Sequence, residues 1–508
     1  MIKLLASFTS LSLLLILFAV NRGFDISDEG LYALLVVPEQ QNSAGIFNYD
    51  LFFKLFYKIT GIEFGIIGLR LLRLVLYVLA AISLTSFWKT LAGSAKLSIQ
   101  HFFISLLGIF AGYAFLPQSL SYNSLSVVIT CFWLALISQR NKTPAHYFLI
   151  GLLLACMAYT KITASLGLGL LTIFWLIYAK DIKLTSVLGL ILPFAIIELT
   201  MYLVLGEFAF ARILDARQMM AHRSEYSFLL LFKYTAVGCF WLVLVAIPFF
   251  FSGKLRASAP KLKYTMLFIA LILLVCIGYY TAIAQEWNHI VLLLTVAFLA
   301  YLAPRLPFAS IPSHQRYLLA TLLVLPFLLH LGSNVYWLRL GIHYWVFWLI
   351  AAFYLGSLID KSLIAKMSLA VGGFTLVLVA NGIWIHPFQQ EPLWKATQEW
   401  TYGHGKNIKL TEKQIEVLTA VEPLVQEQEQ LLAFYRIPGI AYLLNKKSPK
   451  SPGFWTKSQT EYFFPSGYQA EVLLFYSLDS LPSFVKSDFS KTYVQLPDGE
   501  ELQILWRK

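Results

Sequence analysis

The chain has 508 residues, of which 58% are hydrophobic and only 13% are charged, and its mean hydropathy is +0.69. A soluble globular protein is about half apolar and about a quarter charged, so this composition excludes an ordinary soluble domain. The formal charge of +12 does not indicate a nucleic-acid partner, because the basic residues stand singly between apolar runs rather than along one face.

Long apolar runs follow one another from the N-terminus. A run of about 20 apolar residues crosses the hydrocarbon layer as a helix, in which every backbone amide finds a partner. The first run follows Lys3, and Val20-Asn21-Arg22-Gly23 does not match a small-residue cleavage site, so we expect a retained first span. In total the sequence predicts about 13 transmembrane helices. They lie near residues 4–20, 66–87, 101–117, 123–138, 145–160, 163–179, 184–204, 229–252, 264–283, 289–303, 317–332, 343–359 and 367–384.

Basic residues in the short loops predict which side of the membrane each loop faces, because Lys and Arg accumulate on the cytoplasmic side. With Lys3 inside, alternate loops are basic and nearly free of acid. The remaining loops contain the acidic residues, and an odd number of spans places the C-terminal end outside with them. The basic loops contain residues 89–96, 140–142, 180–183, 254–263, 305–316 and 361–366.

The sequence changes character at His386-Pro387, where charged and turn residues increase. Thr411-Glu412-Lys413-Gln414 is a capping box that predicts the start of a helix. Residues 472–476 predict a buried strand, and residues 492–506 predict a terminal hairpin with its turn at 497–500.

We therefore expect an all-α polytopic membrane protein with a small C-terminal α+β soluble domain. The transmembrane domain is predicted over residues 1–384, with outer loops at 21–65 and 205–228. The soluble domain is predicted over residues 385–508, outside the membrane. We expect this domain, with its segment 434–439, to cover a cavity or to bind the acceptor.

The densest group of charges follows the first span, where Asp25, Asp28 and Glu29 lie within five residues. Their mutual repulsion raises their pKa values unless a cation compensates. A carboxylate held in this way is able to act as a general base on a hydroxyl or an amine. The alternative interpretation is a solvated loop that begins an interfacial helix with Asp28 as its N-cap.

The stretch DEGLYA, followed by GIFNYDLFFKLFYKITGIEFGIIGLRLLRLVLYVLAA, resembles the opening of the membrane-embedded GT-C glycosyltransferases. That family includes the bacterial aminoarabinose transferases and the protein O-mannosyltransferases. Asp28, Glu29, Tyr32 and Arg70 stand where the family has an Asp-Glu pair, a Tyr one turn later and an Arg that begins the second span. A second similarity is the Thr-Lys turn at Lys161. One departure is the segment 48–50, Asn-Tyr-Asp, where many members have Lys-Pro-Pro.

The resemblance implies inverting transfer of a sugar from a polyprenyl-phosphate donor to a lipid, glycan or protein acceptor. Asp28 is the expected catalytic base. Glu29 is the second expected catalytic residue, and it is expected to orient the acceptor or to pair with an arginine of the 212–223 loop. A lipid phosphate needs cations, preferably guanidinium groups. The expected phosphate-binding residues are Lys161, Arg212, Arg217, Arg223 and Arg70, and the expected substrate-binding residues are Asp25, Tyr32, His222 and Asn334.

Each of these residues also has a structural interpretation. The arginines of the loop after residue 204 also suit pairing with lipid headgroups or with nearby acids. Lys161 could instead extend its side chain to the lipid headgroups without binding a substrate, and Arg70 could instead anchor a transmembrane helix at the membrane interface. Asn334 also suits a helix C-cap.

The cofactor and the function class have alternatives as well. Some GT-C enzymes place a divalent metal such as Mg²⁺ or Mn²⁺ beside such acids and others do not, and no cofactor follows from the sequence itself. A transporter or flippase of lipid-linked saccharides also needs outer acids and cations, although it typically has Gly/Pro-broken spans in corresponding halves. A membrane scaffold or sensor leaves the outer acids and cations unexplained.

The expected location is the bacterial cytoplasmic membrane, with membrane lipids as partners and the active site facing the periplasm. The segment 385–508 contains no cysteine, which is common in bacterial outer domains. The Asn-x-Thr site at Asn141 falls on the predicted inner side.

Overall fold

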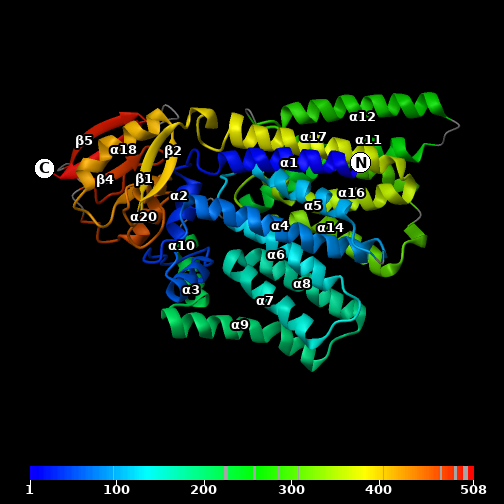
Figure 1. Cartoon of the computed structure of the whole chain (residues 1–508), viewed down its shortest axis with the longest axis horizontal. Helices are drawn as coiled ribbons and strands as arrows, with labels where there is room; N and C mark the ends of the chain where they lie inside the picture. The colour runs from blue at the N-terminus through cyan, green and yellow to red at the C-terminus, as the bar shows by residue number, and fades with distance from the viewer. Residues whose placement is uncertain are drawn as a thin grey trace.

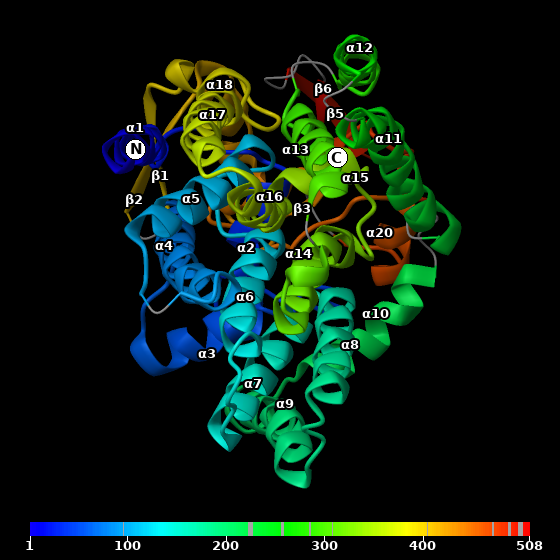
Figure 2. The same ribbon diagram turned by 90° about the vertical axis from the view of Figure 1, so that its right-hand side faces the viewer.

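The computed structural model describes residues 1–94, 96–221, 227–255, 259–283, 286–306, 308–403, 405–469, 472–485, 489–495 and 501–507. Long helices lie side by side and make up most of the molecule, and a smaller part with strands lies at one end of them (Figure 1). Seen from the opposite end, most of these helices are viewed nearly along their axes (Figure 2).

The long helices coincide with the predicted spans, since each predicted span overlaps a helix. By length and composition, eight helices among the described residues are able to cross a membrane, and four shorter apolar helices accompany them. The number of crossings and their orientation stay predictions. The helices are α1 (Ile2–Ala19), α4 (Ile66–Leu91), α5 (Ile99–Phe110), α6 (Tyr122–Ile137), α7 (Pro144–Thr160), α8 (Ile162–Ala179), α9 (Leu184–Leu205), α11 (Phe228–Lys254), α12 (Pro260–Tyr280), α13 (His289–Leu302), α14 (Ser313–His330), α16 (Trp345–Ile359) and α17 (Ser362–Val379).

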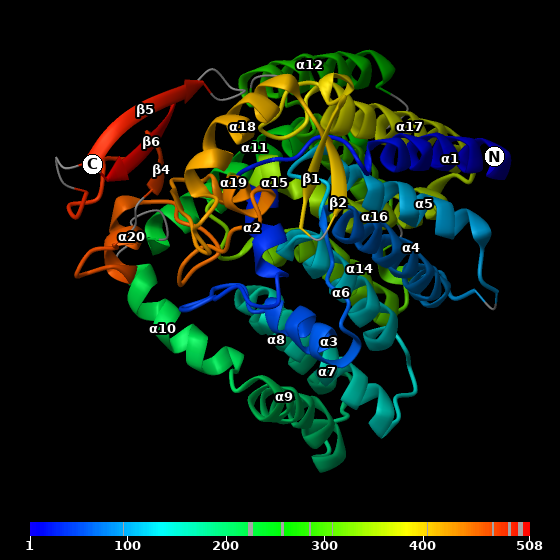
Figure 3. The ribbon, with the colours of Figure 1, turned by 60° about the vertical axis from the view of Figure 1, so that its left-hand side comes forward.

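Short helices fill the connections between them. Four of these lie near the end that carries the strands: α2 (Asp28–Leu35), α3 (Asp50–Thr60), α10 (Ala209–Ala221) and α15 (Trp337–Leu340) (Figure 3). The remaining single turns are η1 (Ala111–Ala114), η3 (Ala303–Arg305), η4 (Phe308–Ser310), η5 (Gly341–Tyr344), η6 (Ala380–Ile385) and η7 (Leu393–Lys395).

The C-terminal part contains a hairpin and a mixed sheet. The hairpin pairs β1 (Gln398–Tyr402) with β2 (Lys406–Leu410), and the sheet has the order β3-β4-β6-β5. Strands β3 and β4 are parallel, whereas β4, β6 and β5 are antiparallel neighbours. The sheet and its helices are β3 (Leu432–Phe434), β4 (Val472–Tyr476), β5 (Phe489–Gln495), β6 (Glu501–Arg507), α18 (Glu412–Val425), α19 (Pro438–Leu443) and α20 (Lys457–Phe463).

Three local predictions for this part are confirmed. The Thr411 side chain accepts from the backbone of Gln414, and the Gln414 side chain accepts from the backbone of Thr411, so the capping box begins α18. Val472–Tyr476 is a buried strand, and β5 pairs with β6 as the two arms of the terminal hairpin. The predicted turn at 497–500 lies outside the described residues.

The segment after α1 is shared between the two parts of the molecule. Phe24, Ala33 and Leu34 belong to the same apolar core as residues of α18 and α19. Gly23 donates its N–H to Lys409 O (2.8 Å), and Gly439 donates its N–H to Ile26 O (2.7 Å). The loop that carries the acidic motif is therefore fixed by the C-terminal part as well as by the long helices.

Candidate functional site

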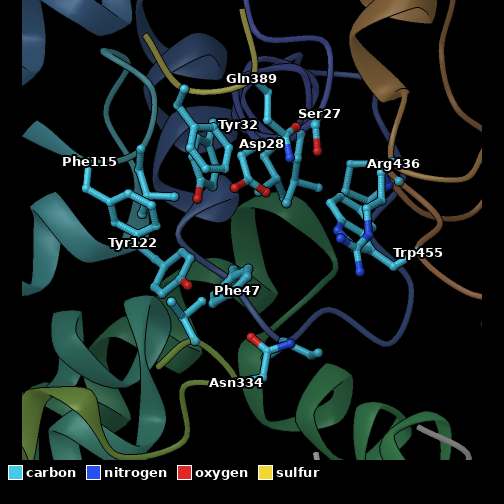
Figure 4. Close-up of a pocket in the computed structure, with 18 of the residues that line it drawn as sticks. Ser27, Asp28, Tyr32, Phe47, Phe115, Tyr122, Asn334, Gln389, Arg436 and Trp455 are labelled. Atoms are coloured by element: carbon cyan, nitrogen blue, oxygen red, sulfur yellow. The ribbon is translucent and has the colours of Figure 1, made fainter. Parts of the chain in front are cut away.

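A cavity of about 850 Å³ lies where α2, the ends of the long helices and the C-terminal part meet. In Figure 4, Asp28 lies at the cavity wall between two groups: Tyr32, Tyr122 and Phe115 lie on one side, and Arg436 and Trp455 lie together on the other. The predicted site residues Asp28, Tyr32 and Asn334 all line this cavity.

Asp28 begins α2 and is half-buried at the cavity wall. Burial raises its pKa to about 6, partly opposed by the guanidinium groups of Arg436 and Arg339. A carboxyl group with a pKa near neutrality is suited to accept a proton from a substrate. The alternative interpretation of Asp28 as an N-cap is wrong, because Ser27 precedes the helix in that position.

Glu29 points away from the cavity and is completely buried. Arg70 donates to both of its oxygens, from Nε (2.9 Å) and from Nη2 (2.8 Å), and Ser119 Oγ donates a further hydrogen bond (2.5 Å). Arg70 also donates to the backbone carbonyls of residues 19, 20, 22 and 23. Both side chains are therefore committed to joining α4 to the loop before α2. Glu29 therefore pairs with Arg70 of α4 rather than with an arginine of the 212–223 loop. The expected roles of Glu29 in catalysis and of Arg70 in phosphate binding stay predictions that these contacts do not support.

Asp25, which was predicted to bind substrate, is buried and does not line the cavity. Its side chain is fully buried, and it accepts hydrogen bonds from the backbone N–H groups of Ser27 (2.9 Å) and Glu29 (3.1 Å). Burial, together with repulsion from Asp28, raises its pKa well above the usual value. Asp25 therefore stabilises the first turn of α2, which sets the direction in which Asp28 points.

Aromatic rings form the wall nearest to Asp28. Tyr122 stacks on Phe47 with ring centroids 4.1 Å apart, and it makes an edge contact with Tyr32 at 6.3 Å. Flat aromatic surfaces with polar tips are typical of sites that hold sugars and other amphipathic ligands.

An arginine that is absent from the predicted site residues lines the cavity next to the long helices. Arg339 of α15 donates to Glu286 from Nε and Nη2, at 2.5 Å each, and its guanidinium lies 4.7 Å from the Phe115 ring centroid. Because Glu286 engages only two of the three guanidinium nitrogens, Nη1 is left for an anion. The sequence signal that could have identified Arg339 was its position shortly after Asn334, a predicted substrate-binding residue.

A second arginine comes from the C-terminal part, within the segment expected to cover a cavity. Arg436 follows β3, is partly buried and lines the cavity. Its Nε atom is buried without a hydrogen-bond partner among the described residues. The sequence placed Arg436 in a covering segment but gave no reason to single out this side chain.

Three other predicted cations, Lys161, Arg212 and Arg217, do not line the cavity. Lys161 is buried and donates to Leu329 O (2.6 Å), and burial lowers its pKa to about 7. Arg212 is held by both oxygens of Asp50 (2.9 and 2.8 Å) and by Glu207, which corrects its expected role in phosphate binding. Arg217 is exposed on α10. His222 and Arg223 lie outside the described residues.

The acidic residues do not assemble into a recognisable metal site. Within the described ranges, no group of three or more His, Cys, Asp or Glu side chains is arranged to hold a metal ion.

No protein-family model matches the chain, and no curated protein matches it in sequence. Among solved structures, the chain is similar to the crystal structure of ArnT from Cupriavidus metallidurans bound to undecaprenyl phosphate. The sequence identity is 12% and the TM-score 0.42, over 98% of this chain and 97% of that chain.

Proposed function

We propose that the protein is an integral membrane glycosyltransferase that moves a sugar from a polyprenyl-phosphate donor to an acceptor hydroxyl or amine on the extracytoplasmic face. The observation that supports it most strongly is one cavity that brings together the Asp28 carboxylate and the guanidinium groups of Arg339 and Arg436. Transfer from a phosphate leaving group needs a base for the acceptor and cations for the phosphate.

In the proposed reaction, Asp28 accepts the acceptor proton while the acceptor oxygen or nitrogen forms a bond to the anomeric carbon. The bond between that carbon and the phosphate oxygen breaks, and the polyprenyl phosphate leaves from the opposite face, which inverts the configuration. A positioned base of this kind typically contributes about 10²–10⁴ in rate.

Arg339 is the proposed ligand of the leaving phosphate. It precedes α16, so it lies at the end of the long helices, where a lipid-linked donor enters from the bilayer. Its pairing with Glu286 fixes the guanidinium plane before the substrate arrives. Preorganised donors of this kind stabilise developing negative charge without further rearrangement.

The test is a transfer assay with the purified full-length protein in lipid nanodiscs, radiolabelled polyprenyl-phosphate sugars and acceptor panels that include lipid extracts. The Asp28→Asn variant has the same shape but is unable to take up a proton, so we expect transfer to fall by about 10²–10⁴. Donor binding and thermal stability should stay at the wild-type level. Asp215→Asn, an exposed acid on α10, is the matched control and should keep full activity.

A different outcome points to the alternative class. If the wild-type protein binds donors but transfers no sugar to any acceptor in the panel, the glycosyltransferase proposal is wrong. Movement of the same lipid across the bilayer of proteoliposomes would then favour a transporter of lipid-linked saccharides.

A further inference from the structure

One side of the cavity is built entirely by the C-terminal part. We name this side the C-terminal wall and define it by Arg436, residues 451–453, Trp455 and Gln459, all of which belong to the segment after β3. Figure 4 shows Arg436 and Trp455 together on this wall, across from the aromatic side chains of the other wall.

Arg436 is held in place by its backbone rather than by its side chain. Its φ of +59° lies in the left-handed region, which residues with a side chain rarely adopt. Its N–H donates to Phe454 O (2.9 Å), which ties it to the neighbouring loop. The guanidinium group is thus presented to the cavity by a fixed backbone.

The Arg436 side chain lacks the partners that buried guanidinium groups usually have. Its Nε atom is buried and unpaired, and in the described part of the chain it forms no ion pair. Two other charged side chains of the cavity are paired, because Glu286 contacts Arg339 and Glu391 contacts Lys395 (2.8 Å). Buried polar atoms are nearly always hydrogen-bonded, so an unpaired one in a cavity indicates a ligand.

Trp455 is positioned by buried Gln459. The Gln459 Oε1 atom accepts from Trp455 N (2.8 Å), and its Nε2 atom donates to Gly453 O (3.4 Å). The Ser451 hydroxyl donates to the same Gly453 carbonyl (3.0 Å). The loop is therefore preformed, and the indole is ready to receive the apolar face of a sugar ring.

We infer that the C-terminal wall is an acceptor subsite for a sugar that carries an acidic group, with Arg436 on the carboxylate or phosphate and Trp455 against the ring. This assignment to the acceptor rests on the proposed function. The donor is assigned to the opposite side, because Arg339 lies next to the long helices whereas Arg436 belongs to the strand-containing part. A forked guanidinium binds the two oxygens of an acidic group in one plane.

The test measures binding, so it does not depend on transfer. Glucuronate, glucose 6-phosphate and glucose are titrated against the full-length protein in nanodiscs by ligand-observed NMR. We expect the acidic probe that fits to bind about tenfold more tightly than glucose, the effect of one charge-assisted hydrogen-bonded pair. Arg436→Gln should abolish this preference, and Trp455→Leu should weaken the binding of all three probes.

Controls keep the result interpretable. Arg140→Gln removes an exposed arginine that does not line the cavity and should leave every affinity unchanged. Arg436→Lys keeps the charge but loses the fork, so it should retain part of the preference even if Arg436→Gln fails to fold. A preference for glucuronate or for glucose 6-phosphate identifies the acidic group as carboxylate or phosphate.

Two results would overturn the inference. One is equal binding of acidic and neutral probes by the wild-type protein, and the other is an unchanged preference in Arg436→Gln. If the preference depends on Arg436 but Asp28→Asn transfers sugar normally, the subsite stands and only the proposed role of Asp28 as the base is wrong.

Discussion

Asp28 and Glu29 are neighbours in the chain and carry the same functional group, but Asp28 lines the cavity and Glu29 does not. Glu29 is fully buried, and four hydrogen bonds occupy its two oxygens. Asp28 is half-buried, faces the cavity and has two cations near enough to influence its pKa. This difference shows that a charged side chain whose hydrogen-bond partners all lie within the protein stabilises the fold. A charged side chain that is accessible from a cavity is available for catalysis.

The same contrast applies to the arginines. Arg70 uses all three guanidinium nitrogens on protein groups, whereas Arg339 keeps one nitrogen free of Glu286 and Arg436 has an unpaired Nε. The number of occupied donors therefore separates the anchoring cations from those that a substrate is able to use.

The most severe effect is expected from Arg70→Met, which leaves Glu29 buried without its cation. Breaking a buried pair by removing one partner typically costs about 3–5 kcal/mol. We expect a large drop in the midpoint of thermal unfolding in nanodiscs. Asp28→Asn, measured in parallel, should change stability by no more than about 0.5 kcal/mol. Equal stability of Arg70→Met and the wild type would remove the distinction between the two sides of α2.

Arg339→Gln should lower kcat by about 10²–10³, because a preorganised donor to the leaving phosphate is lost. The measurement is steady-state transfer over a range of donor concentrations, with Arg140→Gln, an exposed arginine outside the cavity lining, as the control that should not change. An unchanged kcat with a raised donor KM would assign Arg339 to ground-state binding alone.

Gly30→Ala tests the contact that holds α2 against the C-terminal part. A Cβ atom at this position would lie 2.3 Å from Gly439 N and 2.4 Å from Gly439 Cα, so the two backbones must separate. Overpacking of this kind costs about 1–3 kcal/mol. Unfolding and transfer assays should show losses of both stability and activity. Gly169→Ala, where the added atom meets nothing within 4 Å, should be neutral.

The pH dependence of transfer should report Asp28 directly. Because the base must be ionised, kcat/KM should rise with pH through a pKa of about 6 and fall about tenfold per unit below it. Arg436→Gln should shift this rise in kcat/KM to higher pH, because the Arg436 guanidinium stabilises the charged form of Asp28 and so lowers its pKa. If kcat/KM rises over the same pH range in Arg436→Gln as in the wild type, Arg436 does not act on Asp28.

The sequence by itself determined the elements of the fold. Apolar runs of sufficient length have few alternatives to a helix in a membrane, so each predicted span overlaps an observed helix. The capping box at Thr411 and the strand at Val472–Tyr476 depend on neighbouring residues only, and both are present. Asp28 and Tyr32 were found because a motif places them one turn apart on the same helix.

Only the tertiary structure determined which charged side chains remain accessible to a substrate. The sequence does not show that Arg70 turns to Glu29, that Arg212 turns to Asp50, or that Arg339 and Arg436 reach one cavity from segments almost 100 residues apart. Such partners depend on how distant segments pack and on which groups lose contact with water. The availability of a charged side chain is therefore a property of the folded molecule and not of its local sequence.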